Sequence, residues 1–359
     1  MKRLIVILII LVLLFAGCSK GGFEIQPVTE NSEPALCQGF SPYYNSVAVW
    51  DGYIYYNRLS EKEGEPHSCI MRILKSADSF NEAQFVLKNA QLVKQSGQFI
   101  IADISSGDSK KTAVLDLSQN GRQVFSTAGT DSFALVDSTL FYTHGYTLNA
   151  RNLTSGESKQ IYEGSIDFIK AEDSRVYFGA DTALWQVTND HACKKLLDGA
   201  FSPFYITAID NILYFYRPIN SGYTLNKLEP DKGESTIISD ITSPIIISHQ
   251  QSTLYAVYNT AADMASFLKT SDTANISPQL VDKDFNAYSL LDSALFAYSD
   301  NEGLTINIYN RQFVLDNYLR YGAAFGLDQQ SLAVQQTEGA NSVISVIDLE
   351  SGSVHTIAP

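Results

Sequence analysis

The chain has 359 residues, with 25 lysines and arginines against 39 aspartates and glutamates, which gives a formal net charge of −14. Hydrophobic residues make up 45% of the chain and charged residues 18%, a balance that is ordinary for a folded protein and excludes a largely disordered one. The excess of acid argues against nucleic-acid binding, because that activity needs a basic surface to displace the counterions of the phosphate backbone.

The first residues have the features of a bacterial lipoprotein signal. Lys2 and Arg3 precede an apolar run from Leu4 to Ala16. At about 1.5 Å per residue this run spans roughly 20 Å of helix, short of the ~30 Å hydrocarbon core, which favours a signal peptide over a transmembrane helix. The segment that ends in Ala16-Gly17-Cys18 resembles the bacterial lipobox, although Phe15 stands where leucine is usual. We expect residues 1–17 to be a signal peptide and Cys18 to be lipidated, with a plain secretory signal as the alternative.

Residues 18–36 are predicted to be a flexible tether. They begin with Ser19-Lys20-Gly21-Gly22 and stay polar to about Pro34, a composition typical of linkers. A lipidated bacterial protein of this kind lies on the extracytoplasmic side of the cell membrane. Because an acidic body is repelled by anionic lipid, we expect the anchor to be the whole of its membrane contact.

Three cysteines follow Cys18, namely Cys37, Cys69 and Cys193. Their number is odd and far below the density of a disulfide-stapled scaffold. Cys37 and Cys69 could form a disulfide outside the cytoplasm or stay as thiols, and both alternatives are open. Cys193 is then expected to be a buried apolar filler.

A repeat organises the rest of the chain. A turn pair followed by alternating apolar and aromatic residues is clearest at Asp51-Gly52-Tyr53-Ile54-Tyr55-Tyr56. It recurs about every 40 residues, a period that indicates a solenoid, a propeller or an array. The further copies begin at Ser96, Asp137, Asp173, Asp210, Gln251, Asp292 and Asp328.

The residues inside each unit predict strands rather than helices. Short runs rich in β-branched and aromatic residues are separated by turn residues, as in Leu148–Leu153, Thr154-Ser155-Gly156-Glu157 and Lys159–Tyr162. Four such strands in each repeat predict an all-β fold, a β-propeller over residues 37–359. We expect eight four-stranded blades, with seven blades and an irregular segment as the alternative.

The repeat also carries a family resemblance. A lipobox followed by units of the form turn-x-Leu-Tyr-Phe, as at Asp210–Phe215, resembles bacterial lipoproteins that contain a domain of unknown function called DUF5050. That family is itself similar to the propeller of LDL-receptor-related proteins, and the likeness covers roughly Ser46 to Pro359. The resemblance implies an extracytoplasmic binding domain without an assigned ligand, and it implies no reaction.

Motifs for catalysis are missing from the sequence. The five histidines are scattered over different repeats, and no cysteine or histidine spacing indicates a zinc site. There is no nucleophile elbow and no phosphate-binding glycine loop. Asp103–Asp108 and Asp300–Gly303 are better explained as hairpin turns than as calcium loops. We therefore expect no metal, no cofactor and no enzymatic activity.

One face of the predicted ring carries more aromatic residues than the other. The connections between blades share a face with the loops that join second and third strands, and rigid loops are where binding residues concentrate. Tyr43, Tyr44, Phe201 and Tyr321 lie in such connections and are the candidate binding residues. Packing between blades is the alternative role for these rings. The opposite face carries short Asp-Gly and Asp-Ser turns, which we expect to offer little surface.

The sequence as a whole predicts a membrane-anchored, extracytoplasmic binding module for an unidentified protein or glycan of the cell envelope. Two alternatives are kept. The first is a scaffold lipoprotein for envelope assembly. The second is a hydrolase of cell-wall carbohydrate, which would need two opposed carboxylates in the central channel.

Overall fold

The computed structural model describes residues 47–62, 65–106, 109–128, 130, 132–172, 174–250, 252–260, 265–270, 279–280, 286–290, 295–299, 304–308, 311–315, 324–338 and 341–358. Within these ranges the regular elements are β-strands and three short 3₁₀ helices, η1 (Phe80–Glu82), η2 (Leu117–Gln119) and η3 (Pro203–Tyr205). The part of the chain that is described contains no helix with the length and apolar character to cross a membrane.

The described strands form six four-stranded sheets and one seven-stranded sheet, which we number 1 to 7 in chain order. Sheet 1 consists of β1 (Val47–Trp50), β2 (Tyr53–Lys62), β3 (Glu65–Leu74) and β4 (Gln84–Lys88), and sheet 2 of β5 (Ala90–Ser96), β6 (Phe99–Ser106), β7 (Ser109–Asp116) and β8 (Arg122–Ala128). Sheet 3 consists of β9 (Phe133–Val136), β10 (Thr139–His144), β11 (Thr147–Asn152) and β12 (Ser158–Glu163). Sheet 4 consists of β13 (Ile166–Glu172), β14 (Arg175–Ala180), β15 (Ala183–Val187) and β16 (Cys193–Asp198).

Sheet 5 is the seven-stranded sheet. It consists of β17 (Ile206–Ile209), β18 (Ile212–Ile219), β19 (Gly222–Glu229), β20 (Gly233–Gln250), β21 (Thr253–Thr260), β22 (Ala265–Thr270) and β23 (Gln279–Leu280). Sheets 6 and 7 consist of β24 (Asn286–Leu290), β25 (Leu295–Ser299), β26 (Leu304–Ile308) and β27 (Arg311–Leu315), and of β28 (Ala324–Leu327), β29 (Ser331–Glu338), β30 (Asn341–Asp348) and β31 (Val354–Ile357).

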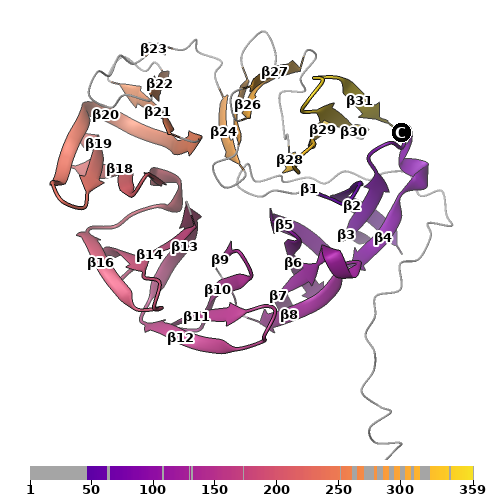
Figure 1. Cartoon of the computed structure of the whole chain (residues 1–359), viewed down its shortest axis with the longest axis horizontal. Coiled ribbons are helices and arrows are strands. Elements are labelled where there is room, and N and C mark those ends of the chain that lie inside the picture. The colour runs from indigo at the N-terminus through magenta and orange to yellow at the C-terminus, as the bar shows by residue number, and fades with distance from the viewer. Residues whose placement is uncertain are drawn as a thin grey trace, which may run out of the picture.

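The sheets stand around a common centre, with the first strand of each sheet innermost (Figure 1). Within every sheet each strand pairs antiparallel with the next one along the chain. Stacking the sheets radially buries both of their faces, which a single four-stranded sheet cannot do. The fold is a β-propeller, and this part of the sequence prediction is confirmed.

The turn pairs of the repeat lie between the first and second strands of the sheets. Asp51 and Gly52 have φ angles of 46° and 80°, and Asp210 and Asn211 have φ angles of 47° and 70°. Two successive left-handed residues form the tight hairpin turn that matches the twist of the flanking strands, and Asp, Asn and Gly are the residues that tolerate it. Asp at these positions therefore marks the start of a hairpin, as it does in most copies of the repeat.

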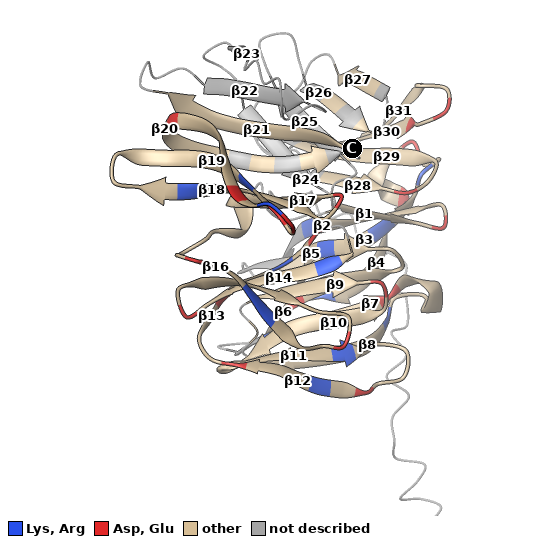
Figure 2. Ribbon diagram, turned by 60° about the vertical axis from the view of Figure 1, so that its left-hand side comes forward, with Lys and Arg blue, Asp and Glu red and all other residues tan. Residues whose placement is uncertain are grey.

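The apolar core is divided into clusters that fill the spaces between neighbouring sheets. Ala48, Tyr55 and Ile70 of sheet 1 pack on Leu92 and Ile100 of sheet 2. Comparable clusters join sheets 2 and 3, sheets 3 and 4, sheets 4 and 5, and sheets 6 and 7. Acidic and basic side chains are interspersed over the ribbon, with many acidic residues at the turns (Figure 2).

The ring closes between sheets 7 and 1, whose strands come from opposite ends of the described chain. Val47 and Met71 share a cluster with Ile344 and Ile357. A Cβ atom on Gly326 would come within 2.8 Å of the Val47 side chain and 3.1 Å of its backbone, so this close approach requires glycine. Backbone hydrogen bonds add to the contact, because Phe80 N donates to Ala358 O at 3.3 Å and Ala358 N donates to Asp78 O at 3.4 Å.

Several sequence predictions lie outside the described residues. These are the signal peptide, the tether with Cys18, the start of the propeller domain at Cys37, and the aromatic residues Tyr43, Tyr44 and Tyr321.

Cys69 is buried on β3, and burial raises the pKa of its thiol. The disulfide with Cys37 stays a prediction. Cys193 is half-buried, rather than buried as expected, and packs against the apolar residues between sheets 3 and 4.

Candidate binding site at the mouth of the ring

The antiparallel order of the strands gives the ring two different faces. We call the turn face the one with the hairpin turns between first and second strands, such as Asp51–Gly52. We call the loop face the one with the turns between second and third strands and the connections between sheets. The strands alternate in direction, so the two sets of connections must lie at opposite ends of the strands.

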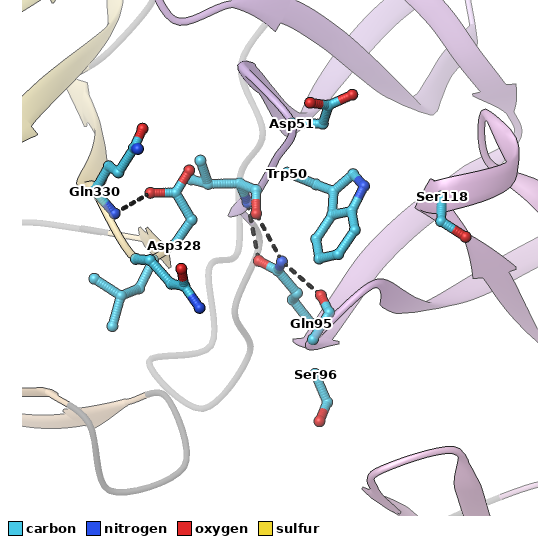
Figure 3. Close-up of a pocket in the computed structure, with 11 residues that line it drawn as sticks. Trp50, Asp51, Gln95, Ser96, Ser118, Asp328 and Gln330 are labelled. Carbon is cyan, nitrogen blue, oxygen red and sulfur yellow. Dashed lines mark hydrogen bonds between the residues drawn. The ribbon is translucent and has the colours of Figure 1, made fainter.

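A pocket of about 750 Å³ lies on the turn face, which is within the ~300–1,000 Å³ usual for small-ligand sites. Turns of three sheets line it, namely the β28–β29 turn, the β1–β2 turn and the β5–β6 turn, with Ser118 of η2 beside them. In Figure 3 the Trp50 indole lies at the centre, with Asp328 and Gln330 on one side and Ser118 on the other.

Some polar residues of the lining hold the pocket together. Gln95 is buried, and its side-chain amide accepts from Val49 N at 2.9 Å and donates to Val49 O at 2.8 Å and to Gly97 O at 2.9 Å. Asn57 makes the equivalent pair of bonds with the backbone of Leu92 at 2.7 and 3.0 Å. The two amides join sheets 1 and 2, since Gln95 links the inner strands β5 and β1 and Asn57 links β2 to β5. Both are buried polar groups, which need such partners.

Asp328 is likewise occupied by structural contacts. Its Oδ1 accepts from the backbone N–H groups of Gln330 and Ser331 at 2.8 and 2.7 Å, and Lys75 Nζ lies 2.9 Å from its Oδ2. Burial alone would raise the pKa of this carboxyl, but the Lys75 ammonium and the two N–H groups together lower the pKa below its usual value. The Lys75–Asp328 ion pair thus joins sheets 1 and 7 beside the pocket.

Other groups of the lining have no hydrogen-bond partner in the part of the chain that the structure describes. These groups are the side chains of Asp51, Ser96, Gln329 and Gln330 and the Trp50 indole N–H. Asp51, Gln329 and Gln330 are exposed. Trp50 is half-buried, because part of its ring covers the cluster between sheets 1 and 2. Its remaining surface faces the pocket.

A second polar cluster lies on the inner strands across the ring. Thr207 Oγ1 is 2.8 Å from His249 Nδ1 and donates to Glu172 Oε2 at 3.3 Å, and Lys170 Nζ lies 2.6 Å from Glu172 Oε1. Thr207 is 0% exposed, so its hydroxyl cannot reach a substrate. Thr207 and Glu172 both approach the same His249 nitrogen, which is not the geometry of a base that activates a nucleophile. This cluster is best explained as a crosslink between three inner strands.

Phe201 is the one residue of the predicted binding set that the structure describes. It lies between sheets 4 and 5 on the loop face, is half-buried, and packs edge-on against Phe215 with ring centroids 5.8 Å apart. Its role in binding stays a prediction. Two loop-face residues that the sequence did not indicate are strongly exposed, Tyr146 at 77% and Ile219 at 45%.

The expectation that the turn face offers little surface is wrong. Each turn is short, but the inner turns of neighbouring sheets converge around the mouth of the ring and enclose a pocket together. The sequence signal was the pair Trp50-Asp51, an aromatic residue directly before the first turn. In the part of the chain that is described, no group of three or more histidine, cysteine or acidic side chains could hold a metal ion.

No protein-family model matches the chain, and no curated protein sequence matches it. Solved structures do match. One from a study of two prolyl endopeptidases has 10% identity and a TM-score of 0.52, over 88% of this chain and 59% of that chain. The β-propeller domain of the Trilobed protease from Pyrococcus furiosus has 11% identity and a TM-score of 0.49, over 88% and 97%.

A third similar structure is PorZ, a bacterial surface component of the type-IX secretion system of Porphyromonas gingivalis, with 10% identity and a TM-score of 0.44. That match covers 88% of this chain and 45% of PorZ. The chain therefore spans about half the length of PorZ and somewhat more of the prolyl endopeptidase. At these identities the likeness concerns the fold, and the class of protein that it defines is the β-propeller.

Proposed function

We propose that the chain is a binding module, tethered outside the cytoplasm, whose ligand occupies the pocket on the turn face. The observation that carries the proposal is the lining of that pocket. An aromatic ring and four polar side chains that have no hydrogen-bond partner among the described residues line it, and they come from three sheets. Small-ligand sites combine such an apolar surface with a few well-placed polar groups. The ligand is a protein or a glycan of the cell envelope, and no catalytic step is required.

The number of blades is part of the proposal. Sheet 5 holds seven strands because β20 runs through 18 residues, pairing first with β19 and then with β21. Tyr216 and Leu225 from its first half pack on Leu254 and Tyr258 from its second half. The halves therefore face each other as neighbouring blades do elsewhere. Counting them separately gives eight blades, with β20 shared between two of them.

The anchor is proposed from the sequence and makes a direct prediction. Cys18→Ala removes the thiol that would carry the lipid, so the variant should stay as uncleaved precursor or move from the membrane to the soluble fraction. Cell fractionation and mass spectrometry of the N-terminus measure both outcomes. A variant that is still processed, lipid-bearing and membrane-bound would contradict the lipobox interpretation.

Photo-crosslinking in cells tests the binding proposal. A photoreactive amino acid at Gln329, on the rim of the pocket, should capture a ligand, and the added substitution Trp50→Ala should abolish the capture. The same amino acid at Tyr146 probes the loop face, where exposed Tyr146 and Ile219 support the alternative surface around Tyr43, Tyr44, Phe201 and Tyr321. Capture from Tyr146 alone would move the binding site to that face.

A further inference from the structure

The free polar groups of the pocket form a particular set. Ser96 offers a hydroxyl, and Gln329 and Gln330 offer side-chain amides. Each of these groups both donates and accepts hydrogen bonds, while Asp51 only accepts and the Trp50 indole only donates. A ligand that forms hydrogen bonds with all of these groups must carry several groups that each donate and accept hydrogen bonds.

The charges of the lining exclude one class of ligand. Among the described residues, the lining contains Asp51 and Asp328 but no lysine or arginine. The lysine that lies closest in the hydrogen-bond network, Lys75, already contacts Asp328 Oδ2 at 2.9 Å and Ser331 Oγ at 3.0 Å. An anionic group such as a phosphate would meet the carboxylate of Asp51 with no cationic side chain of the described lining to offset the repulsion, which is unfavourable. The ligand is therefore neutral or cationic.

Trp50 by itself does not distinguish a neutral ligand from a cationic one, because an indole face can hold either a cation or an apolar ligand surface. The hydrogen-bonding groups of the pocket do distinguish them. An ammonium group has donors only, so by itself it would use Asp51 but would leave the donors of Ser96, Gln329, Gln330 and Trp50 unmatched. A chain of hydroxyl groups on a flat, partly apolar ring matches all of them.

We propose that the turn-face pocket binds a neutral saccharide, with a sugar ring stacked on Trp50 and its hydroxyl groups bonded to Asp51, Ser96, Gln329 and Gln330. The proposal rests on the proposed function, since it names the ligand class of the same site. Trp50 is held in place by its contact with the cluster between sheets 1 and 2, so the platform is formed before the ligand arrives. Such preorganisation lowers the entropic cost of binding.

Tryptophan fluorescence tests the proposal, because Trp50 and Trp185 are the two tryptophans of the chain. Trp185 lies on β15, stacks on Phe178 and donates to Ala180 O at 3.1 Å. In the full-length Trp185→Phe variant, purified in detergent, Trp50 is the single reporter. We would titrate it with tetrasaccharides of glucose in α- and β-linkage and of N-acetylglucosamine. We expect one or more to shift the Trp50 emission and to protect it from acrylamide quenching.

Two substitutions at equivalent turns give the control. Asp51→Asn changes an exposed turn residue with φ of 46° in the pocket, and Asp210→Asn changes one with φ of 47° outside its lining. Asn tolerates this backbone conformation. By calorimetry on the full chain, Asp51→Asn should weaken saccharide binding about tenfold, which corresponds to ~1.4 kcal/mol. Asp210→Asn should leave binding unchanged, and Trp50→Ala should abolish it.

The outcomes separate the two proposals. If no saccharide protects Trp50 but a lysine-rich peptide does, the saccharide assignment is wrong while the pocket remains the binding site. Equal losses from Asp51→Asn and Asp210→Asn would also overturn the assignment, since the effect would then be structural. If Trp50→Ala leaves the cellular crosslink from Gln329 intact, the proposed function itself fails.

Discussion

Two buried tyrosines show how differently the same residue can be used. Tyr216 Oη donates to Val257 O at 3.0 Å, and burial raises its pKa well above the usual value. Tyr56 is 2% exposed in the cluster that closes the ring, and burial raises its pKa as well. Its hydroxyl has no hydrogen-bond partner among the residues that the structure describes. A buried hydroxyl without a partner has lost its hydration and gained nothing in return.

The pair predicts opposite effects of one substitution. Tyr56→Phe should increase the free energy of unfolding by about 1 kcal/mol, because it removes an unsatisfied polar atom from the core. Tyr216→Phe should decrease it by about 1–2 kcal/mol, because it leaves the Val257 carbonyl without its donor. Urea denaturation of both variants measures the difference. Destabilisation by Tyr56→Phe would mean that its hydroxyl has a partner after all.

At this scale the sequence predicted which side chains are buried but not what they contact. The alternating pattern placed Tyr55 and Tyr56 on a strand, and both are buried. The partners of Tyr216 and Gln95 lie on distant strands, 41 and 46 residues away along the chain. The repeat does not encode such pairs, because they depend on how neighbouring sheets are rotated. Trp50 belonged to the repeat only as the residue before a turn, so its place in a pocket was not foreseeable from its own unit.

The β28–β29 turn is an element whose stability depends on one charge. Asp328 closes the turn through the N–H groups of Gln330 and Ser331 and reaches Lys75 at the end of sheet 1. Both side chains of the ion pair are about one-fifth exposed, at 21% and 22%. Solvent therefore screens this pair less than a pair on the open surface.

The ion pair makes stability depend on pH. The folded pKa of Asp328 is lowered, so its contribution is complete above the unfolded value of ~3.9 and is lost as the pH falls through the folded pKa. At pH 7, Asp328→Asn should cost about 1–3 kcal/mol of unfolding free energy. The gap between variant and native protein should narrow as the pH falls below ~4. Denaturation curves at several pH values measure it, and exposed Asp137→Asn should show neither effect.

The sequence predicts the end of a strand well where the strand stops at a turn residue. It predicts the end less well where the strand continues past a turn residue and stays paired with its neighbours. Asp240 and Pro244 are typical turn residues, so local preference alone would end a strand between Ile238 and Ile245. In the structure both residues lie within β20, with Asp240 at φ 65°. Ile241 pairs with Tyr223 on one side and Thr260 on the other, and these contacts outweigh the local preference.

The whole molecule is closed without a shared strand, by side-chain contacts and by the two backbone hydrogen bonds of Ala358. Sheet 1 is built from β1–β4 and sheet 7 from β28–β31, so among the described strands neither end of the chain completes the sheet of the other. The contact depends on the apolar cluster, on the Lys75–Asp328 pair, and on His355 Nε2, which lies 2.8 Å from Ala77 O. Loss of this contact would expose apolar faces on both sheets.

Removal of the last two strands tests the closure. Deletion of residues 342–359 takes Ile344, Val346 and Ile357 from the cluster, at roughly 1.5–3 kcal/mol for each side chain. We expect loss of soluble, folded protein, since the sum approaches the ~5–15 kcal/mol of a typical domain. An unchanged melting temperature would show that the ring does not close there.

Two single substitutions on β31 test the closure of the ring in a protein that still folds. Ile357 is fully buried in the cluster, whereas Val354 on the same strand is 51% exposed. Ile357→Ala should lower the free energy of unfolding by about 2–5 kcal/mol. Val354→Ala should change it by less than about 0.5 kcal/mol. Thermal denaturation compares the two, and similar shifts would argue against a packed closure at this strand.

The shared strand β20 also determines where the chain can be cut. Between sheets 4 and 5 the backbone passes through a connection at residues 199–205 that belongs to no strand, and such segments are where proteases act and insertions are accepted. The two halves of sheet 5 are instead linked by β20, which is paired on both sides at Ile241. The backbone is also closely packed there, because a Cβ atom on Gly222 would come within 2.3 Å of the Ile241 carbonyl oxygen. Limited proteolysis should therefore cut at residues 199–205, between sheets 4 and 5, while the two halves of sheet 5 stay in one piece.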